Sequence, residues 1–295
     1  PVPLTPRTVP ARATVAERDR LLALHPSPAE AVDIGLRRLT RLWERRRDHE
    51  DFAVLRIGVG VRPAAIDITY PPDEVGEQPR LEAAPITVAL RAGTVLGVSG
   101  TGPAAAALHR WIVTQLAVAH SPDLLPIAVL GAPLVQEEWG SARWLPHVAA
   151  EWLLGNDADR SAAIADRLGS SMARGSIEPG FAPAGSPNPA PRAVVLLTNA
   201  AELRRQPAVA RLLARADELG LAVVCLADEP RRLPPECRTV IHVDGDVATM
   251  TGDSTASPFR AERVSAEAFD GVCRSLAPLV APSPGSGAQA ALPDL

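Results

Sequence analysis

The sequence contains no lysine, so all 30 of its basic residues are arginine. Lysine forms Schiff bases with carbonyl substrates, and it contacts the terminal phosphates in an intact phosphate-binding loop. This stretch of chain therefore offers no residue for Schiff-base chemistry and no loop lysine for nucleotide hydrolysis. Aromatic residues are also few, at 3% of the chain, whereas there are 30 prolines. We expect the prolines to form turns and to interrupt helices and strands, and we expect aliphatic side chains to fill most of the core.

Other absences narrow the class of protein. The three cysteines, Cys225, Cys237 and Cys273, show no C-x-x-C spacing, which suits a reduced, cytosolic protein better than a disulfide scaffold. No apolar run approaches the ~20 residues that span a membrane. There is no signal peptide and no initiating methionine, so we expect Pro1 to mark a cut inside a longer protein. The net charge of −4 predicts no general affinity for nucleic acid.

The chain is 46% apolar over 295 residues, which allows one large domain or two small ones. Continuous apolar runs alternate with helical patterns, as in sheets whose parallel strands are buried on both faces. We therefore predict an α/β fold with an open, mostly parallel sheet and helices on both faces. The predicted strands are Val54–Val61, Ala65–Tyr70, Ile86–Leu90, Pro126–Leu130, Arg192–Leu197, Leu221–Leu226 and Thr239–Val243. The predicted helices are Thr14–Leu24, Pro28–Leu39, Pro207–Leu219 and 265–280.

The order of these elements predicts three parts. Residues 1–53 form an N-terminal helical extension, irregular over 1–12, and the main domain with its own first strands covers 54–280. Residues 281–295 are a low-complexity linker toward a following domain. Within the main domain, residues 170–192 are rich in Ser, Gly, Pro and Ala and are predicted to form a flexible surface loop.

The stretch Thr94–His120 predicts a buried strand, a glycine-rich turn and an amphipathic helix. The predicted turn is Gly97-Val98-Ser99-Gly100-Thr101-Gly102-Pro103-Ala104. On the pattern G-x-x-x-x-G-K-[ST] both glycines are in frame, but Pro103 takes the place of the lysine and Ala104 that of the magnesium-binding hydroxyl. The glycines at 97, 100 and 102 are still expected to let backbone N–H groups form a nest for phosphate. The prediction is a degenerate P-loop that folds well and binds triphosphate poorly, although similar turns occur in α/β proteins without a ligand.

A densely charged segment, Leu42–Phe52, precedes the main domain. Two interpretations carry equal weight. In the first, its arginines pair with neighbouring carboxylates on a solvated surface, which is worth at most ~1 kcal/mol per pair. In the second, the segment is a docking surface anchored by Trp43 with Arg45, Arg46 and Arg47.

Several histidines and tryptophans are candidate site residues by their chemistry. His109 and His120 flank the helix that follows the turn, and without a partner at ligand spacing we expect surface or capping histidines. The tryptophans at 139, 144 and 152 are expected to pack beside the sheet.

Four short sequence motifs outside the predicted turn are similar to those of a known protein family. They are Leu42–Phe52 with Leu55–Gly60 (LWERR…DF…LR.G.G), Gln115–Ala117 with His120–Asp123, Trp144–His147 (WLPH), and the ending Ala291–Leu295. With these marks the chain resembles the FtsK/SpoIIIE superfamily of motor ATPases, and most closely the first, degenerate ATPase-like domain of the EccC-type ATPase of type VII secretion. The resemblance covers roughly residues 20–295.

The departures from the family pattern carry the functional prediction. The resemblance implies an acidic pair after an apolar strand, yet Val194–Leu197 is followed by the uncharged Thr198 and Asn199. It also implies a polar Thr-Gln sensor pair, yet Leu226–Pro230 reads LADEP. With the lysine, the hydroxyl, both acids and the sensor changed, we predict a domain that does not hydrolyse ATP and holds no metal or resident cofactor.

The predicted function is therefore a non-catalytic pseudo-ATPase module, an adaptor in a protein-export motor. The alternative is a sensor that binds ATP or phosphate weakly at Gly97–Ala104, Thr198 and Asn199 without turnover. An enzyme that uses a dinucleotide is disfavoured, because the glycines lack the G-x-G-x-x-G order and no Asp or Glu stands at the end of the strand Pro126–Leu130. The resemblance implies an oligomeric complex at the cytoplasmic face of the bacterial inner membrane. Its implied partners are other domains of the motor and membrane-base subunits, not nucleic acid. Contact with the membrane is expected only through segments outside this chain.

Overall fold

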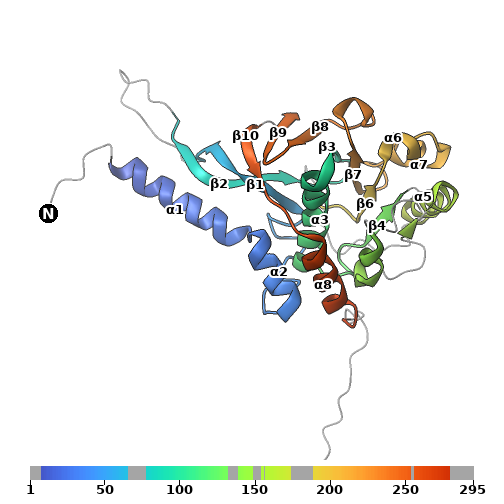
Figure 1. Ribbon diagram of the computed structural model, residues 1–295, viewed down its shortest axis with the longest axis horizontal. Helices are drawn as coiled ribbons and strands as arrows, with labels where there is room; N and C mark the ends of the chain where they lie inside the picture. Colours follow the sequence, from blue (N-terminus) through green and yellow to red (C-terminus); the bar gives the residue numbers. More distant parts are fainter. Residues whose placement is uncertain are drawn as a thin grey trace, which may run out of the picture.

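The computed structural model describes residues 8–65, 78–131, 139–148, 154–155, 157–173, 189–253 and 256–279. Most of the predicted strand at 65–70, Trp152, most of the predicted loop at 170–192 and the linker at 281–295 lie outside the described residues. Within the described ranges the strands form one ten-stranded sheet with helices packed against it (Figure 1).

One part of the sheet is parallel and deeply buried. Six strands lie in the order β8-β3-β7-β6-β4-β5, and each neighbouring pair is parallel. Every residue of β3, β4 and β6 is buried, as continuous apolar runs predict. The predicted α/β fold with a mostly parallel sheet is therefore confirmed. The bounds are β3 Val95–Gly100, β4 Ile127–Leu130, β5 Leu154–Gly155, β6 Ala193–Leu197, β7 Leu221–Ala227 and β8 Thr239–Asp244.

The rest of the sheet is antiparallel and continues it as β2-β1-β10-β9, with β9 paired to β8. Two of these strands, β9 and β10, were not predicted. Half of the residues of β9 are exposed, and β10 contains Pro258, so neither shows the apolar run that marks a buried strand. Strand β2 also begins six residues before its prediction. The bounds are β1 Val54–Pro63, β2 Arg80–Ala89, β9 Val247–Gly252 and β10 Ala256–Ala261.

The predicted helices are present, although not always with the predicted length. Helices α5 and α6 were not predicted, and α5 includes residues 170–173 of the predicted loop. Helix α1 begins at Thr8, although residues 1–12 were predicted to be irregular; Pro10 lies in its first turn, where a missing N–H costs nothing. Helix α2 starts at a capping box in which Ser27 and Glu30 satisfy each other's backbone N–H groups. The bounds are α1 Thr8–Leu24, α2 Pro28–Arg37, α3 Gly102–Ala119, α5 Ala158–Ala173, α6 Ala200–Leu203, α7 Pro207–Ala214 and α8 Ala266–Leu276, with short 3₁₀ turns η1 Gly140–Trp144, η2 Pro146–Val148 and η3 Pro230–Arg232.

The helices divide between the two faces of the parallel strands. The chain moves along the sheet in one direction from β3 to β4 and in the other from β5 to β6 and β7. Because parallel crossovers are right-handed, α3 lies on one face and α5, α6 and α7 on the other. In agreement, α2, α3 and α8 pack together, and α5 packs against α6 and α7.

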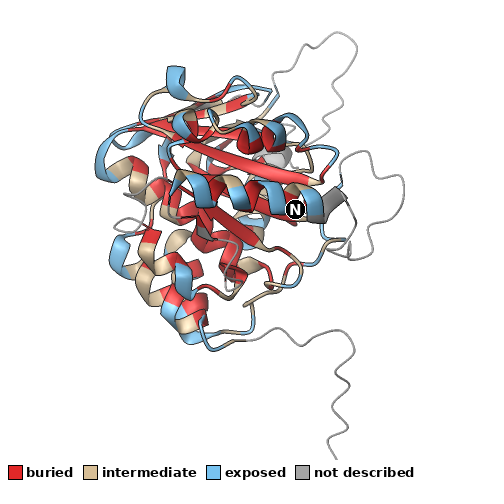
Figure 2. Ribbon diagram, turned by 90° about the vertical axis from the view of Figure 1, so that its right-hand side faces the viewer, coloured by how far each residue is buried: buried red, intermediate tan, exposed pale blue. Residues whose placement is uncertain are grey.

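The core is the layer between the strands and these helices. Figure 2 shows buried strands enclosed by helices whose outer surfaces are exposed. The largest fully buried side chains include Trp111 of α3, Phe269 of α8 and Phe52. Helix α1 lies apart from this layer and runs along β2 at one edge of the sheet (Figure 1). The proposed division into an extension at 1–53 and a domain at 54–280 remains a prediction.

Candidate functional site

The connection from β3 to α3 is much tighter than a phosphate-binding loop. Strand β3 continues through Gly100, and α3 begins at Gly102, so Thr101 alone joins them. Residues 97–99 pair with β7 and residues 97–100 with β8. The backbone groups of this segment therefore bond along the sheet and do not curl around a ligand. The predicted glycine-rich turn is wrong for Gly97–Gly100, which are strand residues.

The three glycines of the predicted turn serve packing and backbone conformation. A Cβ on Gly97 would lie 2.6 Å from Cδ1 of Leu233, so the missing side chain lets the segment after η3 pack onto β3. A Cβ on Gly100, at a φ of 150°, would lie 2.7 Å from the carbonyl oxygen of Val243. Gly102 has a φ of 73° in open space, a conformation that favours glycine. Gly100 and Gly102 therefore both adopt a positive φ, the backbone region that favours glycine.

The start of α3 has no side-chain cap. Thr101 is the N-cap residue, yet its hydroxyl accepts no hydrogen bond from the first turn. Pro103 lies in that turn, a position that suits a residue without an N–H. Ala104 is half-buried and offers only a methyl group. The first turn thus keeps the partial positive charge of a helix N-terminus without the lysine and hydroxyl of a nucleotide site.

A pocket of about 390 Å³ opens beside this helix start, where the carboxyl ends of β3, β6 and β7 meet. Four predicted site residues line it together: Gly100, Gly102, Thr198 and Asn199. The other predicted residues, Gly97, Ser99, Thr101, Pro103 and Ala104, are not part of its lining. Much of the remaining wall consists of small apolar side chains, namely Ala105, Ala106, Ala201, Leu226 and Ala227.

Three of the four polar side chains that were predicted to bind nucleotide, Ser99, Thr198 and Asn199, make hydrogen bonds within the protein. Ser99 is fully buried, and its Oγ lies 3.1 Å from Nδ1 of His242. The hydroxyl of Thr198 donates to the carbonyl of Leu130 at 3.3 Å. Asn199 has a left-handed backbone and donates from Nδ2 to Glu202 at 2.6 Å. None of these groups supplies the carboxylate that a magnesium ion requires.

Two charged residues line the pocket, and they neutralise each other. Arg232 donates to Asp228 at 3.3 Å, and both side chains are exposed. Within the described residues no group of three His, Cys, Asp or Glu side chains could hold a metal ion. The pocket therefore combines a helix N-terminus and one arginine–aspartate pair with weakly polar walls.

Two further pocket residues were missed by sequence reasoning. His109 and Trp139 both line the pocket and are buried, and their Nε2 and Nε1 atoms have no hydrogen-bond partner among the described residues. Burial, with Arg110 nearby, lowers the pKa of His109 to about 3, so its ring is neutral. The prediction of surface histidines is wrong for His109. It failed because α2 and α8 cover α3, which is buried almost all round.

The structure also places His120 and two of the three tryptophans considered in the sequence. His120 is the C-cap residue of α3, which confirms the expected capping position, but its side chain is buried, and burial lowers its pKa to about 3. Trp139 packs edge-on against Phe269 at 5.9 Å, as expected for a large side chain beside the sheet. Trp144 is instead 39% exposed, with Arg143 stacked on its ring at 5.1 Å.

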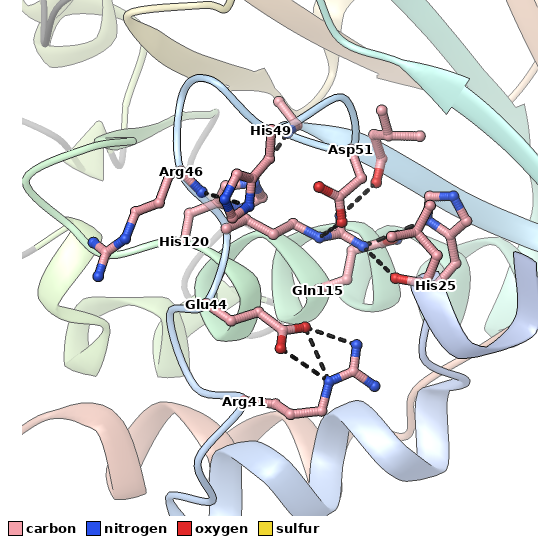
Figure 3. Close-up of polar contacts among 12 residues, drawn as sticks. His25, Arg41, Glu44, Arg46, His49, Asp51, Gln115 and His120 are labelled. Carbon is pink, nitrogen blue, oxygen red and sulfur yellow. Dashed lines mark hydrogen bonds and ion pairs between the residues drawn. The ribbon is translucent and has the colours of Figure 1, made fainter. Parts of the chain in front are cut away.

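The predicted docking residues are mostly internal. Arg45 is 4% exposed and pairs with Asp51 at 2.9 Å. Trp43 donates from Nε1 to the carbonyl of Ala117 at 3.1 Å, and Arg47 donates to backbone carbonyls of the main domain. Figure 3 shows His25, Asp51 and Gln115 gathered in this region, with Arg41 and Glu44 paired beside them. The docking prediction is therefore wrong for Arg45, whereas Arg46 is exposed and its role stays a prediction.

The sequence is similar to several characterised secretion proteins, although no protein-family model matches it. It is 31% identical over 158 residues to EccC4 of the ESX-4 secretion system of Mycobacterium tuberculosis, which is 48% of this chain and 12% of that protein. It is 29% identical over 152 residues to EccC of Thermomonospora curvata, which is 46% of this chain and 11% of that protein. The chain thus spans only about a tenth of the length of these relatives.

Solved structures share the fold. The cytoplasmic domain of the type VII secretion ATPase EccC of Thermomonospora curvata superimposes with a TM-score of 0.53 at 16% identity, over 88% of this chain and 34% of that one. ATPases 2 and 3 of EssC from Geobacillus thermodenitrificans give a TM-score of 0.52 at 15% identity, over 81% and 50%. These matches confirm the P-loop NTPase-like fold. Together with the sequence matches, they confirm that the chain resembles an EccC-type, FtsK/SpoIIIE-like ATPase domain.

Proposed function

Taking the relation to EccC-type ATPases as the premise, we propose that this chain is a non-catalytic ATPase-like module of a type VII secretion motor. It acts as a structural adaptor for protein export, at the cytoplasmic face of the bacterial inner membrane. Its partners are other domains of the motor and subunits of the membrane base. The proposal concerns this stretch alone, because the relatives are many times longer than the chain.

The observation that carries the proposal is the course of the backbone. A P-loop places several backbone N–H groups around the phosphates before its helix begins. Here β3 pairs on both sides up to the end of the segment, and one residue connects it to α3. The chain thus lacks the loop itself as well as the lysine and the magnesium-binding hydroxyl.

The rest of the pocket supports the same function. Thr198 and Asn199 lie where the acidic pair of an active domain is expected, and both bond within the protein. Catalysis of phosphoryl transfer depends on positioned charge, and a single arginine finger is worth 10³–10⁵ in rate. Loss of the lysine, the metal ligand and the acids together leaves no arrangement that stabilises the transition state.

One observation favours a second candidate, a phosphate or nucleotide sensor without turnover. The pocket holds about 390 Å³ beside the uncapped start of α3, and Arg232 lies on its wall. A helix N-terminus attracts a single phosphate group, and Arg232 can donate to the same group if it exchanges its pairing with Asp228. They do not replace a metal ion, so such binding would not depend on magnesium.

An ATPase assay on the purified chain tests the main proposal. We expect no magnesium-dependent turnover, and none after the double change Pro103→Lys and Ala104→Thr, because the acids and the loop are still missing. Ala106→Trp, which fills the pocket from a half-buried position, identifies contaminating activity. Turnover that Ala106→Trp abolishes would show that the pocket hydrolyses ATP.

Calorimetry with ATP, ADP and inorganic phosphate, with and without magnesium, tests the sensor. Binding at the pocket should weaken on Arg232→Gln but not on Arg205→Gln, an exposed arginine nearby that does not line the pocket. Heat changes that respond equally to both variants would assign the binding to another surface.

A further inference from the structure

Two exposed large apolar side chains in the described part of the chain lie beside α8. Leu36, near the end of α2, is 44% exposed, and Trp144, the last residue of η1, is 39% exposed. Both α2 and η1 pack against α8, and Figure 1 shows α2 next to α8. A single exposed apolar side chain is common on a protein surface, whereas a group of them marks an interaction site. The question is therefore whether these two side chains belong to one surface.

Residues of α8 connect the two side chains. A Cβ on Gly271 would lie 3.1 Å from Cδ2 of Leu36, so the missing side chain leaves room for the leucine against the helix. One turn further along α8, the guanidinium of Arg274 lies over the ring of Trp144, with its Cζ 5.4 Å from the ring centre. Residues three apart in a helix are neighbours on its surface. Leu36 and Trp144 therefore belong to one surface, which crosses the C-terminal half of α8.

This surface has an excess of positive charge, although the whole chain has a net charge of −4. Arg143 also lies over the ring of Trp144, at 5.1 Å, and Arg38 donates from Nε to a backbone carbonyl in the last turn of α8 at 3.1 Å. Both arginines are exposed, and neither pairs with a carboxylate within the described ranges. Arg274 pairs with Asp270 at 2.7 Å. Three arginines and one carboxylate leave an excess of two positive charges.

Other charges on α2 and α8 leave this excess in place. Asp33 pairs with Arg37 on α2 at 3.3 Å, and Glu30 is bound in the capping box at the start of that helix. Glu267 is exposed in the first turn of α8, two turns before Arg274 and about 10 Å from it along the helix. The Debye length is about 8 Å at physiological ionic strength, so an exposed charge at that distance is largely screened. We call the surface formed by the following five residues the α8 face: Leu36, Arg38, Arg143, Trp144 and Arg274.

The tryptophan at the centre of the α8 face is held in position by the residues around it. Its neighbours in the motif WLPH, Leu145 and His147, are each 1% exposed, and Nε2 of His147 lies 2.8 Å from the carbonyl of the residue that caps α3. Ser141 of η1 donates to Asp270 of α8 at 2.7 Å, which joins the turn to the helix. The motif therefore presents Trp144 outward on a fixed support. A side chain that is already ordered loses little conformational entropy when a partner binds.

We propose that the α8 face is a docking surface for an acidic segment of a partner protein, in which carboxylates flank a large apolar side chain. The apolar side chain packs on Trp144 and Leu36, and the carboxylates pair with Arg143 and Arg38. Tryptophan and arginine are enriched among residues that contribute most to binding, and arginine pairs bidentately with carboxylates. An acidic membrane fits less well, because polybasic membrane sites contain about 4–8 basic residues. The proposal does not depend on what the pocket binds, so its test is separate from the ATPase assay.

Selection of short random peptides displayed on phage, with the purified chain as bait, tests the chemistry of the partner. We expect the enriched peptides to combine several Asp or Glu residues with a large apolar residue. Their affinity should fall by about tenfold or more with Trp144→Ser and with Arg143→Glu. The matched controls are Val247→Ser, a change of an exposed apolar side chain on β9, and Arg205→Glu, a charge reversal at an exposed arginine outside the face. Enrichment of basic peptides, no enrichment, or equal affinity for all variants would overturn the proposal.

Fluorescence anisotropy with the most enriched peptide measures the contribution of charge. The affinity should fall when sodium chloride is raised from about 0.1 M to about 1 M, because the Debye length shortens from about 10 Å to about 3 Å. An affinity that does not change with salt would contradict pairing with the arginines. Thermal melts of the variants show whether they fold; if Trp144→Ser does not, Arg143→Glu decides alone, since its side chain is exposed.

Two other occupants of the α8 face are tested in parallel. Sedimentation of the chain without peptide detects binding of a second copy, and flotation with phosphatidylglycerol vesicles detects binding to an acidic membrane. We expect neither to change between the parent and Arg143→Glu. Self-association or vesicle binding that Arg143→Glu abolishes would assign the face to that occupant and overturn the proposal.

Discussion

Lowering the pH from 7.5 to 5.5 should destabilise the protein strongly, because four buried histidines are neutral in the folded state. Burial is the largest cause in each case. It lowers the pKa of His109 and His120 to about 3 and the pKa of His25 and His147 to about 4. In the unfolded chain a histidine titrates near 6.5. Between those values the unfolded state binds more protons, so stability falls as the pH falls through 6.5.

The size of the effect follows from this linkage. Between pH 7.5 and 5.5, a histidine with a pKa of 6.5 unfolded and 4 or below folded contributes roughly 1.3 kcal/mol. The four together remove about 5 kcal/mol, which is comparable to the whole stability of a marginal domain. Glu262 acts in the opposite direction, since its pKa is raised in the folded state. For a chain of this size we expect the melting temperature to fall by on the order of 10 °C.

Urea unfolding at both pH values, followed by circular dichroism, measures the change. His109→Leu should reduce the pH dependence by about a quarter, because it removes one neutral histidine whose Nε2 has no partner among the described residues. His49→Gln, at an exposed position, serves as the control and should leave the pH dependence unchanged. An equal free energy of unfolding at the two pH values would refute the reasoning. So would a His109→Leu variant with the full pH dependence.

Two further predictions concern residues whose roles the structure reassigns. Gly97→Val should destabilise the chain by about 1–3 kcal/mol through its clash with Leu233, whereas Gly97→Val in a chain carrying Leu233→Ala should recover part of that loss in a thermal melt. A loop glycine would show no such recovery. Arg45→Gln should cost about 3–5 kcal/mol because it leaves Asp51 buried and unpaired, while Arg46→Gln should stay within about 0.5 kcal/mol. Equal melting temperatures for the two arginine variants would contradict the burial of the Arg45–Asp51 pair.

The parallel part of the fold was predictable because its strands are apolar throughout. The runs at Ile127–Leu130, Ala193–Leu197 and Leu221–Ala227 have few alternatives to a sheet buried on both faces. The meeting of Gly100 and Gly102 with Thr198 and Asn199 followed from the same pattern, since the carboxyl ends of parallel strands share one edge.

The course of the backbone at Gly97–Gly100 was not predictable from the glycine spacing. The letters GVSG fit a turn and a strand equally well. What decides between them is the packing of Leu233 and Val243, far along the chain, on the two glycines. A pattern of local spacing contains no information about those contacts.

The docking prediction for the charged segment Leu42–Phe52 was wrong at Arg45 for a related reason. Its carboxylates made a solvated surface plausible, and its tryptophan made a docking surface plausible. The arginines instead bind backbone carbonyls at the end of α1 and at Leu124 and Pro191, acceptors that every residue carries and that no sequence pattern marks. Only the approach of the two segments in the fold identifies these acceptors.

The change in backbone matters more for function than the change in side chains. Two substitutions would restore the lysine and the hydroxyl, but they would not free Val98, Ser99 and Gly100 from their pairing with β7 and β8. Each backbone bond broken to open a loop there costs about 0.5–1.5 kcal/mol net. Opening the loop would also uncover the surface on which Leu233 packs. The strand is thus stabilised by the same contacts that remove the phosphate site. The strand therefore keeps the P-loop NTPase-like fold without the loop, which supports the non-catalytic, structural role proposed above.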